Sequence, residues 1–128
     1  VQRHPPAIGV AGRRQQRAEV TRALFETGCK VIMSTDCGIP NVPHSALAPA
    51  LAILQQMSGR PPAEVLTLAT SQSARLLGLP DRGVLAPGKR ADILVVEGDP
   101  TDGLLALERV RLVLKAGEIV HSVAPDRP

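Results

Sequence analysis

The sequence predicts an α/β unit followed by a small β unit, with the change near residue 79. Two observations carry this prediction. A helical pattern over residues 13–27 ends at a glycine and leads into an unbroken apolar run within residues 30–35, which is typical of α/β proteins. Beyond residue 79, Val, Ile and Leu alternate with Gly and Pro, which is typical of strands and turns. With 128 residues, 44% of them apolar and 21% charged, the chain has the size and composition of one ordered domain.

The first half is expected to hold a loop, a helix and a buried strand. Residues 1–12 contain several Pro and Gly and read as a loop. In the helix over 13–27 the apolar face is formed by Val20, Ala23, Leu24 and Thr27, and Gly28 follows as its cap. Because Val31, Ile32 and Met33 in the run over 30–35 are consecutive apolar residues, we expect a strand covered on both faces, as in a parallel sheet.

Three further helices and a β region are expected in order. A helix begins between residues 45 and 49 and ends at Gly59. The next has Pro62 in its first turn, where a missing N–H costs little, and a short one ends at Gly78. Strands and turns are expected over 83–100 and 110–120, with a hairpin around Ala116-Gly117. Two or three strands are marginally stable alone, so this half needs partners.

Composition and charge argue against a nucleic-acid-binding protein and against a membrane protein. The net charge is +3 but the arginines are scattered, and Phe25 is the single aromatic residue, so we expect no nucleic-acid partner. A basic nucleic-acid binder remains a weaker alternative, prompted by charge alone. No apolar run reaches the ~18 residues of a membrane span, and no signal-peptide pattern opens the chain, so no membrane partner is expected.

The two cysteines are predicted to be free thiols. If the chain between Cys29 and Cys37 is extended, they lie roughly 26 Å apart, at about 3.3 Å per residue. A disulfide requires Cα atoms within about 7 Å. Free thiols fit a reducing compartment, so we expect a cytoplasmic protein.

The stretch "STDCGIPNVPHS" carries the candidate chemistry. Asp36 directly follows the predicted strand, and His44 lies eight residues further on. The alternative for Asp36 is a carboxylate that caps a turn, because Asp-x-Gly is common in turns. The alternative for His44 is a surface histidine at a helix start. Cys37 has no identifiable base, so we interpret it as a small packing residue, and we expect Asp92 to accept hydrogen bonds in a turn.

Three segments together resemble a known family. They are "VIMSTDCGIPNVPH", "PPAEVLTLATSQSARLLGL" and "DRGVLAPGKRADILVVEGDP" with "VRLVLKAGEIV". They resemble the C-terminal part of the amidohydrolase superfamily, which are metal-dependent hydrolases built on a (β/α)₈ barrel. The proline-containing loop ending at His44 is most similar to the branch of imidazolonepropionases and Xaa-Pro dipeptidases. The resemblance covers residues 13–120.

The resemblance implies a fold and an activity. Residues 1–79 would be the last strand and helices of a (β/α)₈ TIM barrel, and residues 80–128 would be strands of a small β-sandwich domain. Active sites of such barrels lie at the C-terminal ends of the strands. Asp36 would then be a metal ligand and the general base, and His44 would touch the substrate. The implied cofactor is a divalent metal, zinc by expectation, and the implied substrate is a small cyclic amide or a dipeptide-like molecule.

The chain departs from the family's metal-binding pattern. Its three histidines, His4, His44 and His121, form no His-x-His, whereas zinc takes three or four protein ligands. Ser34 stands where the family usually has glycine. We therefore expect the last third of an enzyme, cut at Val1, inactive alone, and in need of a missing N-terminal part or of self-association. The alternative is a non-catalytic truncated or accessory module that associates through exposed strand edges.

Overall fold

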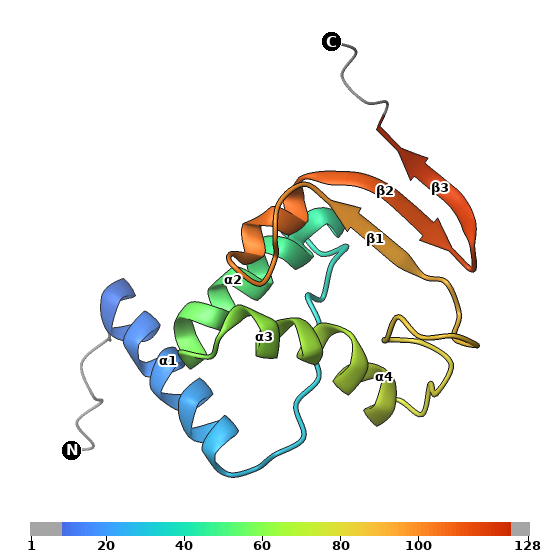
Figure 1. Cartoon of the computed structure of the whole chain (residues 1–128). Coiled ribbons are helices and arrows are strands. Elements are labelled where there is room, and N and C mark those ends of the chain that lie inside the picture. The colour runs from blue at the N-terminus through green and yellow to red at the C-terminus, as the bar shows by residue number, and fades with distance from the viewer. Residues whose placement is uncertain (1–8, 124–128) are drawn as a thin grey trace, which may run out of the picture.

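The computed structural model describes residues 9–123, which form a group of helices with a small sheet extending from one side (Figure 1). Four α-helices come first: α1 (Val10–Glu26), α2 (Leu47–Ser58), α3 (Pro62–Ala69) and α4 (Ser71–Leu76). The strands are β1 (Ile93–Val96), β2 (Val110–Lys115) and β3 (Glu118–Ser122). Two 3₁₀-helices complete the order: η1 (His44–Ala46) before α2, and η2 (Leu104–Glu108) before β2.

The predicted helices are confirmed, and their ends follow the predicted signals. Gly59 ends α2 in a left-handed conformation with φ of 72°, and its N–H donates to the Gln55 carbonyl at 2.9 Å. That conformation is strained for residues with a Cβ atom, which explains the glycine. Pro62 opens α3, as expected for the first helical position.

One hydrophobic core joins segments from both sides of residue 79. Its three most buried side chains are Leu51 of α2, Val65 of α3 and Leu104 of η2. Met33 and Leu107 pack against this cluster. The η2 helix was not predicted from the sequence, although it contributes a residue that is 1% exposed.

Helix α1 has the predicted helical period but does not bury the predicted face. Val20 is 62% exposed and Leu24 is 43% exposed. Ala18, Thr21 and Phe25 are half-buried instead, and α1 packs against α2. The guanidinium of Arg60 lies 4.5 Å from the centre of the Phe25 ring, a cation–π contact. The prediction of a buried Val20 face is wrong within the described chain, because no second element covers it there.

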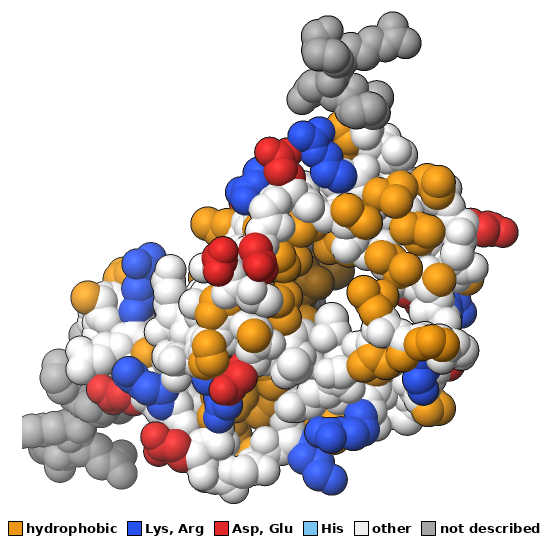
Figure 2. Space-filling view, viewed as in Figure 1, with side chains coloured by type: hydrophobic (Ala, Val, Ile, Leu, Met, Phe, Trp, Pro, Cys, Tyr) orange, Lys and Arg blue, Asp and Glu red, His pale blue; other side chains and the backbone are white. Residues whose placement is uncertain are grey.

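The three strands form one antiparallel sheet in the order β1-β2-β3. The predicted hairpin is confirmed: β2 and β3 are joined through Ala116 and Gly117, whose φ angles are 53° and 87°. Positive φ at both central residues is the signature of a primed hairpin turn. Figure 2 shows apolar side chains gathered over the sheet. The exposed large apolar residues of the strands, on either face, include Leu94, Val95, Ile119 and Val120.

The strand predicted over residues 30–35 is not formed within the described residues. This segment is irregular in the structure, and its side chains are half-buried or exposed, so they are not covered on both faces. A strand is defined by pairing with a neighbour, and the described residues place no other strand beside it. Within residues 9–123, no helix is long and apolar enough to cross a membrane.

Candidate functional site

The segment before Asp36 keeps the side-chain order of a strand without strand pairing. Val31, Met33 and Thr35 are half-buried, whereas Ile32, Ser34 and Asp36 are exposed. This alternation has the period of two expected of extended chain. Met33 packs against the core cluster, so the half-buried set faces the helices. Asp36 therefore lies on the opposite, uncovered side.

Asp36 itself begins a tight loop. Its φ is 53°, in the left-handed region that aspartate tolerates better than most residues. The Gly38 N–H donates to the Val42 carbonyl at 3.0 Å, and the Val42 N–H donates to the Ile39 carbonyl at 3.1 Å. These bonds close the loop, so the chain returns toward the point at which it left the segment.

The loop brings His44 near the aspartate's end of the segment. A Cβ atom placed on Gly38 would lie 3.8 Å from His44 Cε1, so the His44 ring lies beside the loop two residues after Asp36. His44 opens η1, and its side chain is exposed. Within residues 9–123, neither Asp36 nor His44 makes a side-chain hydrogen bond or ion pair. Both side chains are thus exposed and unpaired within this part of the chain.

The sequence also predicted roles for the two cysteines and for Asp92. Cys29 and Cys37 are free, as predicted, and both are exposed within the described residues, so the packing role of Cys37 in the wall of the site stays a prediction. Asp92 is confirmed as a structural acceptor. Its Oδ1 accepts the Ala116 N–H at 2.8 Å and Arg90 Nε at 2.9 Å, and these hydrogen bonds, the backbone one first, lower the pKa of Asp92.

The described residues do not make up a metal centre. Among residues 9–123, no three side chains of His, Cys, Asp or Glu lie close enough together to hold an ion. Asp36 supplies one carboxylate, fewer than the three or four protein ligands that zinc takes. His121 lies exposed on β3, and His4 is outside the described residues. The metal expected from the sequence therefore has one candidate ligand here.

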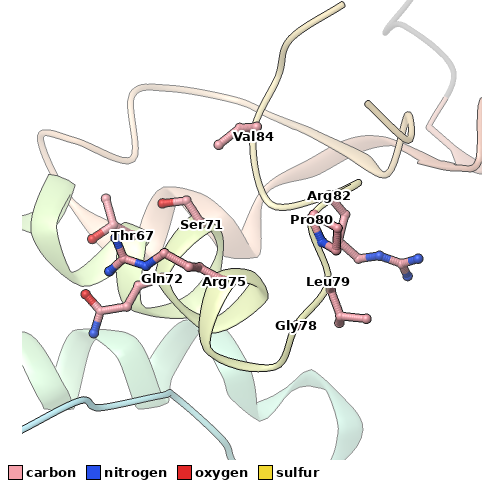
Figure 3. Close-up of a pocket in the computed structure, with 9 residues that line it drawn as sticks. All are labelled: Thr67, Ser71, Gln72, Arg75, Gly78, Leu79, Pro80, Arg82 and Val84. Atoms are coloured by element: carbon pink, nitrogen blue, oxygen red, sulfur yellow. The ribbon is translucent and has the colours of Figure 1, made fainter. Parts of the chain in front are cut away.

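One cavity lies away from both candidate residues. It has a volume of about 760 Å³ and lies between α3, α4 and the loop over 78–84 (Figure 3). Its lining contains neither Asp36 nor His44. A second cavity, of about 540 Å³, is lined partly by Asn41, Pro43 and Ser45 and so borders the His44 loop. The first cavity is therefore separate from the Asp36–His44 loop, and the second one borders it.

One residue that touches the Asp36 segment was missed by sequence reasoning. Gln72 of α4 donates from Nε2 to the Val31 carbonyl at 2.7 Å, across 41 positions of sequence. A glutamine on a short polar helix carries no sequence signal of such a contact. Only the fold, which places α4 next to this segment, reveals the contact.

Comparison with known proteins gives one family. The sequence model described as "Amidohydrolase family" matches residues 4–121. An imidazolonepropionase from Deinococcus deserti is 36% identical over 99 residues, which are 75% of this chain and 25% of the relative. An imidazolonepropionase from Deinococcus radiodurans is 39% identical over 77 residues, 60% of this chain and 19% of the relative. The chain thus spans about a quarter of the length of the curated relatives it matches.

Solved structures give the same picture. A protein from Bifidobacterium longum, assigned as a prolidase, superposes with a TM-score of 0.77 and 38% identity over 86% of this chain and 27% of its own. A Xaa-Pro dipeptidase with bound methionine in the active site superposes with a TM-score of 0.74 and 28% identity, over 82% of this chain and 25% of its own. The arrangement of helices and sheet is therefore shared with the corresponding quarter of larger proteins.

Proposed function

The chain belongs to the amidohydrolase family, and from this premise we propose that it forms the C-terminal part of a hydrolase that cleaves a C–N bond. We propose residues 1–79 as the last strand and helices of a (β/α)₈ barrel and residues 80–128 as strands of a small β-sandwich. The proposed substrate is a cyclic amide or a dipeptide-like molecule. The relatives named as imidazolonepropionase and as Xaa-Pro dipeptidase support both alternatives.

The observation that carries the proposal is the placement of Asp36. Its carboxylate is exposed, has no partner among residues 9–123, and lies on the side of its segment that faces away from the helices. In a barrel that side is the interior, where the ends of the strands hold catalytic residues. We propose that Asp36 is the general base, which takes a proton from the attacking water and returns it to the leaving nitrogen. We propose that His44, from the same loop, contacts the substrate.

A divalent metal, zinc by our proposal, would supply Lewis acidity to such a site. Asp36 is the ligand that this chain offers, and the described residues contain no complete set. We therefore propose that the remaining ligands come from other parts of the whole protein. It follows that the 128-residue chain, tested alone, should not hydrolyse an amide. The two free thiols support our proposal that the enzyme works in the cytoplasm.

The test is Asp36→Asn in the complete enzyme, assayed with imidazolonepropionate and with a Xaa-Pro dipeptide. Removing a general base should lower kcat by about 10²–10⁴-fold, while the circular dichroism spectrum stays unchanged. Asp102→Asn is the matched control, because Asp102 is also exposed and lies outside the Asp36–His44 loop. Unchanged turnover in Asp36→Asn, or equal losses in both variants, would remove Asp36 from the proposed mechanism.

A second function is favoured by the sheet. Both outer strands, β1 and β3, have an edge that no other described strand covers, and Ile119 and Val120 of β3 are 66% and 57% exposed. Such edges pair readily with other chains. The chain would then be a non-catalytic module that associates through these edges. Size-exclusion chromatography with light scattering separates the two ideas: a stable monomer that binds metal stoichiometrically contradicts the module.

A further inference from the structure

We infer that Gln72 is a positioning residue that fixes the side of the chain toward which Asp36 points. This inference rests on the proposed function, because it matters for catalysis only if Asp36 acts there. Gln72 does not touch the Asp36 loop. It acts through the backbone of the segment that leads to Asp36, five residues earlier.

The contact is direct and links two distant parts of the chain. Gln72 Nε2 donates to the Val31 carbonyl at 2.7 Å, and both residues are half-buried. In Figure 3 the Gln72 side chain extends away from Leu79 and Pro80, although it lines the same cavity as they do. This hydrogen bond ties the Val31 backbone to α4, at the start of the segment that leads to Asp36.

Helix α4 is itself held firmly, which allows Gln72 to act as a fixed point. Ala74, on the same helix, is buried, and Gly83 approaches it so closely that an added Cβ would lie 2.7 Å from the Ala74 Cβ. The Ser73 hydroxyl donates to the Leu68 carbonyl of α3. The donor amide of Gln72 therefore belongs to a helix that is fixed on two sides.

Two anchors together set the register of the segment. Gln72 fixes the position of Val31 along the helices, and Met33, packed on the core cluster, fixes which side chains face inward. Because side chains of extended chain alternate, a slip of one residue would turn Asp36 toward the helices and Thr35 outward. Either contact alone would permit that slip, whereas the Gln72–Val31 hydrogen bond and the packing of Met33 together oppose it.

The proposal predicts a loss of order in the segment when the donor is removed. Gln72→Met keeps the length of the side chain and removes the N–H donor, whereas Gln72→Lys restores a donor. Gln56→Met is the matched control, an exposed glutamine on α2. In the 128-residue chain, Gln72→Met should speed tryptic cleavage after the exposed Lys30 and speed amide hydrogen exchange over residues 31–36. Gln72→Lys should reverse both effects, and Gln56→Met should change neither.

In the complete enzyme the same variants separate positioning from binding. A misplaced catalytic group costs up to about 100-fold in rate, so Gln72→Met should lower kcat by about 10–100-fold with KM within about twofold. Gln72→Lys should recover most of that loss. If Gln72→Met leaves both the protection of residues 31–36 and kcat unchanged, or if Gln72→Lys folds and restores neither, the inference is wrong. If the unaltered complete enzyme hydrolyses no amide, the proposed function fails, while the protection experiment still decides the anchoring role of Gln72.

Discussion

At the scale of single residues, contacts decide which aspartate is structural and which is available. Asp92 and Asp36 are both exposed, and the sequence predicts a turn at each of them. Asp92 accepts a backbone N–H and an arginine, so its oxygens are occupied by the fold. Asp36 has no such partner within residues 9–123 and faces away from the helices. Both residues are aspartates, and they differ in the hydrogen-bond partners that surround each carboxylate.

The structural aspartates predict how stability depends on pH. Hydrogen bonds lower the pKa of three carboxyls below the ordinary 3.8: Arg82 acts on Asp81, the Ala116 N–H on Asp92, and the Thr101 hydroxyl on Asp99. A lowered folded-state pKa contributes stability that is complete above 3.8 and is lost as the pH falls below it. The free energy of unfolding in urea should therefore decline from pH 4 downward. In Asp92→Asn the free energy of unfolding should decline less steeply with falling pH. In Asp102→Asn it should decline as it does in the unaltered chain. Parallel curves for all three proteins would contradict this role of Asp92.

At the scale of elements, the loop over 78–84 lies directly on the junction of α3 and α4. Gly83 has φ of 85°, and an added Cβ would lie 2.7 Å from the Ala74 Cβ and 2.9 Å from the Thr70 carbonyl oxygen. Backbone conformation and close packing thus both require glycine at this position. The contact holds α4 in place, and α4 carries Gln72.

Gly83→Ala should destabilise the fold more than the same change elsewhere. Gly88→Ala is the matched control, because its φ is 78° but no atom lies within 4 Å of an added Cβ. The control should lose about 1–2 kcal/mol of unfolding free energy from left-handed backbone alone. Gly83→Ala should lose a further 1–3 kcal/mol or so from overpacking. Equal losses in urea titrations of the two variants would show that the loop can move away from α4.

At the scale of the whole molecule, the helices and the region after residue 79 share one core. Leu51 and Val65 come from helices before that point, and Leu104 comes from η2 after it. Residues from both parts are thus removed from water by the same contacts. We therefore expect one cooperative unfolding transition for the described chain.

Leu104→Ala tests this coupling. Truncating a fully buried leucine should cost about 2–5 kcal/mol. The loss should appear equally in the helical circular dichroism signal and in amide protection of β1 and β2. Leu105→Ala, at a neighbouring side chain that is 52% exposed, should change stability by about 0.5 kcal/mol or less. If the sheet loses protection while the helices keep their stability, the two regions unfold separately.

The sequence was informative where structure is local. Gly59 and Pro62 marked helix ends correctly, and Ala116-Gly117 marked the hairpin turn. It predicted a strand over residues 30–35 that the described residues do not form, because a strand depends on neighbours that sequence spacing does not supply. It also placed Asp36 and His44 on one loop but gave no sign of Gln72, whose contact spans 41 positions. In both cases the sequence lacked information on contacts between residues that are far apart along the chain.

The contact between Arg60 and Phe25 also determines how this protein can be observed by fluorescence. The chain contains no tryptophan or tyrosine, so it has almost no intrinsic emission. Phe25→Trp would place a single indole next to the Arg60 guanidinium, where the end of α1 meets the connection between α2 and α3. Its emission would report the docking of α1 without background from other aromatic side chains. The scarcity of aromatic residues thus makes this helix contact a natural site for a one-probe folding assay.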